Sequence, residues 1–157
     1  MLSRRKAMLG IVGLGVVGVG AYAGPNFLYA ALTPDTEARV LTPLAAYEAA
    51  KAGDIILIDI RRPDEWARTG SPEGGHRVDL RDADFTDRLA ALADGDLGAS
   101  IALICARGVR SARTSNVLAA AGFTNIIDVP EGMLGSGAGP GWINRGLPLV
   151  VDDVGGS

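Results

Sequence analysis

Two short, unbroken aliphatic runs constrain the fold of this chain most strongly. Ile55–Ile58 and Ile101–Ile104 contain no polar residue, and each is followed within a few residues by a turn or a charged residue. Runs of this length are typical of strands buried on both faces of a parallel sheet. Ile126, Ile127 and Val129 predict a third strand of the same kind. Parallel strands need crossover segments, usually helices, so the sequence predicts an α/β fold.

Helical segments are predicted between these strands. Thr42 and Pro43 favour an N-cap and a first helical residue, and Gly53 favours an end, so a helix is expected over Leu44–Ala52. Further helices are predicted over 63–69, 85–92 and 111–121, and a brief strand over 77–80 after a turn at 71–75. In the last helix Thr114, Leu118 and Ala121 have the spacing of one face. We therefore expect one domain, with a central, mainly parallel sheet covered by helices on both faces.

The first 23 residues have the layout of an export signal. Arg4, Arg5 and Lys6 form a basic head, residues 7–23 carry no charge, and Ala21–Ala23 is an A-x-A cleavage pattern. The paired arginines are similar to the twin-arginine type, although Ala7 stands where that signal usually has a bulky apolar residue. We expect cleavage after Ala23 and export to the periplasm. The alternative is an uncleaved N-terminal membrane anchor, which also leaves the domain outside the cytoplasm.

The remaining chain divides into a linker over 24–40, a globular domain over 41–150 and a tail over 151–157. The formal net charge of the whole chain is −3, and the first 23 residues hold three basic residues and no acidic one, so the remaining chain is more acidic still. Such a balance argues against nucleic-acid binding. A single cysteine excludes an internal disulfide, and one histidine leaves few ligands for a transition metal. We expect no metal and no nucleic-acid partner.

Gly13–Gly18 matches the G-x-G-x-x-G spacing of dinucleotide-binding folds. That motif requires a preceding strand and a following helix, whereas this stretch lies inside the predicted export signal. The sequence therefore does not predict a nucleotide site.

Cys105 is the residue most suited to catalysis. It is the only cysteine and directly follows the second buried run, and a helix is expected from Ser111. Ligands bind at the carboxyl ends of parallel strands, where backbone N–H groups of a tight turn and a helix N-terminus attract anions. These groups favour a thiolate beside an anionic substrate, although a lone buried cysteine can also be a plain packing residue. The expected substrate-binding residues are Ala106, Arg107, Gly108, Val109 and Arg110, of which Arg110 is expected to fold over the mouth of the site.

The turn Cys105–Ser111 resembles the active-site loop of rhodanese-like sulfurtransferases. Leu57–Arg61 with Pro63–Trp66 is similar to a second signature of that family, and Glu131–Gly132 with Trp142–Pro148 is similar to its C-terminal end. The resemblance covers roughly 41–150. It implies a rhodanese-like fold and transfer of a sulfane sulfur from thiosulfate or a persulfide, through a Cys105 persulfide, to a thiol or cyanide. It implies no metal or organic cofactor.

The resemblance also implies supporting roles and shows two departures. Asp59 and Arg61 would buttress the active-site loop, with Ser111 as a further support; the alternative for the first two is a surface ion pair. Trp66 and Trp142 are interpreted as packing residues. The family's turn after its first helix is rearranged over 70–76, so His76 is expected to be a surface or turn histidine. Residues 135–141 look inserted, and are expected to form a mobile flap or a plain surface loop.

Two alternative functions stay open. Cysteine-dependent phosphatases and arsenate reductases have a similar loop with the spacing C-x5-R, whereas four residues separate Cys105 from Arg110 here. Ile104 also replaces the histidine that usually precedes the phosphatase cysteine, and no general acid stands out. A non-catalytic sulfur carrier or partner-binding module needs the same thiolate. The expected partners are a small sulfur-containing anion, a thiol acceptor and a protein sulfur acceptor. The protein is expected to be a monomer.

Overall fold

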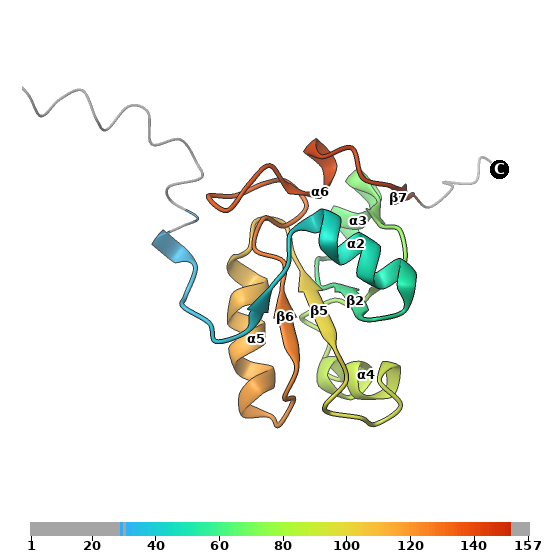
Figure 1. The fold of residues 1–157 in the computed structure, drawn as a ribbon, viewed down its shortest axis with the longest axis vertical. Coiled ribbons are helices and arrows are strands. Elements are labelled where there is room, and N and C mark those ends of the chain that lie inside the picture. The colour runs from blue at the N-terminus through green and yellow to red at the C-terminus, as the bar shows by residue number, and fades with distance from the viewer. Residues whose placement is uncertain (1–28, 30, 152–157) are drawn as a thin grey trace, which may run out of the picture.

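A computed structural model of the chain describes residue 29 and residues 31–151. Its centre is a sheet of five parallel strands in the order β1-β6-β5-β2-β4, as Figure 1 shows in part. The predicted α/β class with a parallel sheet is therefore confirmed. The strands are β1 (Arg39–Val40), β2 (Ile56–Asp59), β4 (Gly75–Arg77), β5 (Ile101–Ile104) and β6 (Ile126–Asp128).

Helices and a small second sheet complete the domain. The two strands of that second sheet, β3 (Ser71–Pro72) and β7 (Leu149–Val150), pair antiparallel. The helices are α2 (Pro43–Ala52), α3 (Pro63–Thr69), α4 (Phe85–Leu92), α5 (Val109–Ala120) and α6 (Gly141–Asn144).

Helices cover both faces of the five-stranded sheet and give it two hydrophobic cores. On one face α2 and α6 pack over the sheet, and the fully buried Trp142 lies in this core with Ala46. The Trp142 ring meets Tyr47 edge-on at 5.9 Å, and its Nε1 donates to Pro148 O. On the other face α4 and α5 contribute Leu89 and Leu118. Because both faces are covered, β5 is apolar throughout and β2 is apolar up to Asp59, as the sequence predicts.

Local sequence explains how α2 begins and ends. Thr42 Oγ1 accepts a hydrogen bond from the Ala45 N–H at 3.3 Å, and Pro43 is the first helical residue. Gly53 ends the helix with φ +80°, a left-handed conformation that favours glycine.

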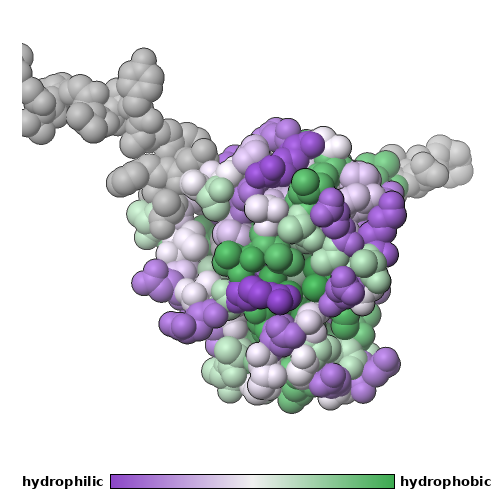
Figure 2. All heavy atoms as spheres, viewed as in Figure 1, coloured by the Kyte–Doolittle hydropathy of each residue, from purple (hydrophilic) through white to green (hydrophobic). Residues whose placement is uncertain are grey.

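In the view of Figure 1, hydrophobic residues gather near the middle of the molecular surface, with hydrophilic residues around them (Figure 2).

Several predicted boundaries differ from the structure. Helix α5 begins at Val109 rather than Ser111. Gly108 is its N-cap residue and has the left-handed φ of +84°, so the chain becomes helical at the next residue. Ala121 follows the helix and is exposed, so it does not share the buried face of Thr114 and Leu118.

The edge strands also depart from the prediction. Strand β4 occupies Gly75–Arg77 instead of 77–80, and the predicted turn at 71–75 contains β3. Beyond β4 the N–H groups of Val78 and Leu80 still donate to Asp59 O and Ile60 O, so pairing continues irregularly. Strand β1 lies within the predicted linker and pairs with β6. Strands this short are defined by their pairing partners and have no periodicity to read.

The predicted export signal over 1–23, including Gly13–Gly18, lies outside the described residues. Within residue 29 and residues 31–151, no helix combines the length and apolar character that crossing a membrane requires.

Candidate functional site

The chain wraps around the sulfur of Cys105 at the carboxyl end of β5. Cys105 is only 1% exposed, and the Gly108 N–H donates to its Sγ at 3.1 Å. Ser111 Oγ lies 3.6 Å from the same sulfur and donates to Gly108 O at 3.1 Å. The structure thus brings Cys105, Gly108 and Ser111 into one hydrogen-bonded unit at the start of α5, which suits the stabilisation of a negative charge on sulfur.

A second segment clamps this turn from the β6 side. The N–H groups of Met133 and Leu134 donate to Cys105 O and Ala106 O, each at 2.9 Å. Gly132 has φ +65°, and a Cβ there would lie 2.6 Å from Ala106 O. Glu131–Gly132 could be recognised from the sequence only as a family signature. The structure shows that glycine at 132 allows the backbone to lie close to Ala106 O.

A pocket opens beside the turn, and most of the predicted site residues line it. The lining from the turn consists of Cys105, Ala106, Arg107, Val109 and Arg110, whereas Gly108 does not line it. The remaining lining residues, Tyr29, Leu32, Glu65 and Leu134, were not predicted as site residues. The pocket therefore combines two arginines and the cysteine with a largely apolar wall.

Part of this wall comes from the N-terminal segment that the sequence reading assigned to a linker. The Arg107 guanidinium lies over the Tyr29 ring, 5.0 Å from its centroid, and its Nη1 donates to Gly135 O at 3.1 Å. Two side chains of α5 hold the segment, because Arg113 donates to Leu32 O at 3.3 Å and Asn116 donates to Asp35 O at 2.9 Å. Linker-like composition gives no signal for such docking.

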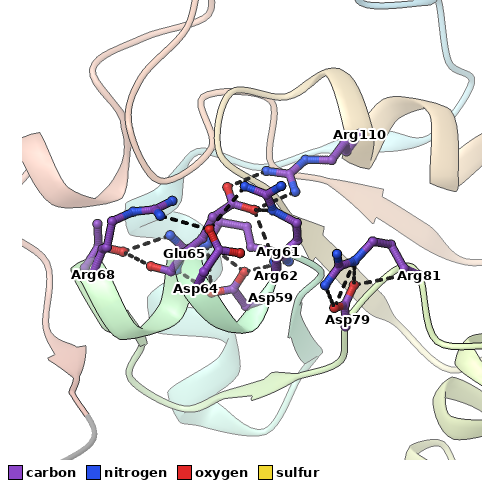
Figure 3. Close-up of polar contacts among 10 residues, drawn as sticks. Asp59, Arg61, Arg62, Asp64, Glu65, Arg68, Asp79, Arg81 and Arg110 are labelled. Atoms are coloured by element: carbon purple, nitrogen blue, oxygen red, sulfur yellow. Dashed lines mark hydrogen bonds and ion pairs between the residues drawn. The ribbon is translucent and has the colours of Figure 1, made fainter. Parts of the chain in front are cut away.

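Arg110 is held by a carboxylate from another helix. Its Nη1 and Nη2 donate to the two oxygens of Glu65, at 2.8 and 2.7 Å, from α5 across to α3 (Figure 3). Arg110 therefore brings no unpaired charge to the pocket, although it is one of the predicted substrate-binding residues. Within residues 31–151 Arg107 makes no ion pair. Glu65 is one of the lining residues that were not predicted, although it lies in the recognised segment Pro63–Trp66.

Asp59 and Arg61 form a buried ion pair, so the surface-pair alternative is wrong. Their side chains are 0% and 1% exposed, and Asp59 Oδ2 lies 2.7 Å from Arg61 Nη2. The other donors of Arg61 bond Thr69 Oγ1 at 2.8 Å and Gly70 O at 2.7 Å. Arg61 thus fixes the end of α3, which carries Glu65, and none of these bonds reaches the 105–110 turn. Support for the turn runs through α3 and the Glu65–Arg110 pair.

Comparison with known proteins identifies the family to which this fold and site belong. The sequence matches the family model described as the rhodanese-like domain over residues 42–135. The chain belongs to this family. No curated protein matches the chain.

Solved structures agree with the rhodanese-like assignment. The polysulfide-sulfur transferase homodimer from Wolinella succinogenes is 25% identical with a TM-score of 0.58, covering 84% of this chain and 90% of that one. A thiosulfate sulfurtransferase from Pseudomonas aeruginosa is 26% identical with a TM-score of 0.58, covering 73% of this chain but only 20% of that one. A rhodanese-related protein from Thermoplasma volcanium is 27% identical with a TM-score of 0.54, covering 73% and 99%. Two of these three structures are named as sulfur transferases, so the family resemblance extends to proteins with that activity.

The segment 135–141, which was expected to be a flap or a surface loop, is organised around a buried carboxylate. Glu131 accepts hydrogen bonds from the Gly141 N–H at 3.0 Å and from Arg145 Nε at 2.8 Å. Ser136 Oγ donates to Pro130 O at 2.8 Å, and Gly135 O accepts a hydrogen bond from Arg107 Nη1. The segment is therefore tied to the rhodanese-like domain at several points, including one beside the pocket.

His76 is exposed on the edge strand β4, as a surface histidine would be. Among residues 29 and 31–151, no group of three or more His, Cys, Asp or Glu side chains is arranged to hold a metal ion.

The Glu65–Arg110 pair makes the stability of the domain depend on acid pH. Burial raises the pKa of Glu65, but hydrogen bonds from Arg110 and the Arg62 N–H, with the charge of Arg61 added, bring the pKa down to about 2. The ordinary value is 4.5. A lowered folded-state pKa stabilises the fold above pH 4.5, and this contribution is lost as the pH falls from 4.5 to 2.

We expect Glu65→Gln to lower the free energy of unfolding at pH 7 by about 2 kcal/mol, because a buried charged hydrogen bond is lost. The difference from the unmodified protein should shrink as the pH falls from 4.5 to 2, since Glu65 is then protonated in both states. Urea denaturation at several pH values measures this. Asp64→Asn, at a half-exposed carboxylate on the same helix, is the control and should change stability little. A difference that stays constant with pH would contradict the role assigned to the ionised carboxylate.

Proposed function

We propose that this rhodanese-like protein is a sulfurtransferase in which Cys105 carries a sulfane sulfur as a persulfide. The observation that carries the proposal is the Gly108 N–H directed at Cys105 Sγ, at the floor of a pocket that also contains Arg107. Backbone N–H groups at a helix N-terminus stabilise negative charge on sulfur without needing a cofactor. The sulfur transferases among the structural neighbours support the same activity.

In the first half-reaction the Cys105 thiolate attacks the outer sulfur of thiosulfate or of a persulfide. A new S–S bond forms to Sγ, the old bond to the outer sulfur breaks, and sulfite or a thiolate leaves with the electron pair. The Arg107 cation attracts the anionic donor, while the Gly108 N–H stabilises charge on the cysteine side. In the second half-reaction a cyanide or thiolate acceptor attacks the outer sulfur of the persulfide. The Cys105 thiolate is thereby released.

Thiosulfate treatment of the purified protein tests this proposal. We expect Cys105 to gain the mass of one sulfur atom, and added cyanide to remove it as thiocyanate. Cys105→Ser should show neither, because Cys105 is the only cysteine. Mass gain without turnover would support the sulfur-carrier alternative. Hydrolysis of an aryl phosphate, without mass gain, would overturn the proposal in favour of a phosphatase.

Export to the periplasm and a monomeric state also belong to the proposal. The Wolinella succinogenes transferase is a homodimer, so light scattering on this protein is an informative comparison. N-terminal sequencing of protein from the cell envelope tests cleavage after Ala23.

A further inference from the structure

The pocket at Cys105 has more apolar surface than an inorganic sulfur donor can use. Its volume is about 380 Å³, and its apolar wall consists of Tyr29, Leu32, Val109 and Leu134. Volumes of about 300–1,000 Å³ are typical of sites for small organic molecules. Thiosulfate is a compact, hydrated dianion, and an aliphatic wall gains no hydrophobic stabilisation from binding it. The reaction of thiosulfate therefore leaves this wall without a role.

Two side chains of the wall are large, aliphatic and exposed. Leu32 is 47% exposed and Leu134 is 38% exposed. They are distant in the sequence, because Leu32 precedes β1 and Leu134 follows β6, yet both line the same cavity. Exposed apolar side chains that gather at one place, rather than being scattered singly, mark a binding surface. The apolar surface that these two side chains leave exposed is available to a ligand.

The part of the wall that precedes the family domain is held in place by hydrogen bonds. Tyr29 O accepts from the Thr33 N–H at 3.0 Å and from Thr33 Oγ1 at 2.7 Å, which closes one turn of chain around Leu32. Leu32 O accepts from Arg113 of α5 at 3.3 Å, and the Tyr29 ring lies against the Arg107 guanidinium. A wall that is already ordered can select among ligands, since no further conformational entropy is lost when one binds.

Arg107 places a positive charge beside this wall. Its guanidinium contacts the Tyr29 ring and donates to Gly135 O, and neither of these two partners carries a negative charge. Arg110, in contrast, is paired with the Glu65 carboxylate. A ligand that matches the pocket therefore combines an anionic group, for Arg107, with an apolar group, for the wall.

We propose that Tyr29 and Leu32 are specificity-determining residues, which make the site prefer a sulfur donor whose anionic group carries an apolar substituent R. The inference rests on the proposed sulfur transfer and names its donor class, of which the thiosulfonates, R–SO2–S−, are the simplest probes. The Cys105 thiolate attacks the outer sulfur of the thiosulfonate, and a new S–S bond forms to Sγ. The S–S bond of the donor breaks, and the sulfinate R–SO2− leaves with the electron pair. Meanwhile R lies against Tyr29 and Leu32.

A series of alkyl thiosulfonates tests the preference. We expect kcat/KM for thiocyanate formation to be about tenfold higher with butanethiosulfonate than with methanethiosulfonate, because the longer chain is partly withdrawn from water against the wall. The two sulfinate leaving groups are electronically alike, so the comparison isolates the contact made by R. Cys105→Ser gives the uncatalysed background. Equal kcat/KM values along the alkyl series would overturn the inference.

Substitutions in the wall locate the preference. Tyr29→Ser and Leu32→Ser should each lower the ratio of kcat/KM for the butyl donor to that for the methyl donor several-fold. Leu97→Ser is the matched control, at a leucine that is 39% exposed and does not line the pocket, and should leave the ratio unchanged. A ratio that is the same in Leu32→Ser, Tyr29→Ser and the unmodified protein would contradict the assignment of specificity to these two residues.

Alkanesulfonates, which have no outer sulfur, test the wall without turnover. Butanesulfonate should protect Cys105 from alkylation by iodoacetamide at a several-fold lower concentration than methanesulfonate, and Leu32→Ser should reduce this difference. The signal has one source, since the chain has one cysteine. Equal protection by the two sulfonates would overturn the inference. Selective protection without thiocyanate formation from any donor would count against the proposed sulfur transfer and not against the wall.

Discussion

Gly108→Ala is expected to abolish sulfur transfer and to destabilise the domain by about 3 kcal/mol or more. Gly108 has φ +84°, and a Cβ at this position would collide with the Pro130 carbonyl, which belongs to the segment clamping the turn. Relief of the collision has to move either the 105–108 turn or the segment after β6. The first movement takes the Gly108 N–H away from Cys105 Sγ, and the second weakens the bonds from the Met133 and Leu134 N–H groups that hold the turn. Thiocyanate formation and urea denaturation measure the two losses.

Gly53→Ala separates backbone strain from the collision. Gly53 has φ +80°, but a Cβ there would have no atom within 4 Å. This variant should lose about 1 kcal/mol of stability and keep full activity. Equal effects of the two substitutions would contradict the role assigned to the close approach of Gly108 and Pro130.

Arg61→Met is expected to lower the free energy of unfolding by about 3–5 kcal/mol, because it leaves the Asp59 carboxylate buried without its partner. The same change removes the bonds to Thr69 and Gly70 that fix the end of α3. Glu65 should then hold Arg110 less firmly, so the KM for thiosulfate should rise several-fold in the protein that remains folded. Urea denaturation and steady-state kinetics measure these effects.

Two controls accompany this variant. Arg68→Ala breaks an ion pair with Asp64 whose side chains are 61% and 50% exposed, and should cost less than about 1 kcal/mol. Combining Arg61→Met with Asp59→Asn should recover part of the stability, since no unpaired charge stays buried. A loss of similar size in Arg68→Ala and Arg61→Met would show that burial does not set the strength of the Asp59–Arg61 pair.

The parts of the fold that sequence reasoning predicted are those whose residues determine local structure. Strands β2 and β5 follow from unbroken aliphatic runs, and α4 has the predicted bounds Phe85–Leu92. The turn after β5 could be located because a strand end, a glycine and a helix start lie within a few residues. Strands β1, β3 and β7 have two residues each and exist through pairing with distant strands, so no local pattern reveals them.

The parts of the site that sequence reasoning missed depend on contacts between distant residues. Glu65 and Arg110 are 45 residues apart, and only the tertiary fold brings the two side chains together (Figure 3). The composition around Asp59 and Arg61 fits an exposed pair as well as a buried one.

Because Tyr29 and Leu32 line the pocket, the part of the chain that forms the site is longer than the family domain. The family match spans residues 42–135, which leaves out this segment, strand β1 and Trp142. A fragment cut to those limits would retain the cysteine turn but lose a wall of its pocket and the largest buried side chain. Insertions or deletions just before the domain, which are usually tolerated, would here change the shape of the site itself.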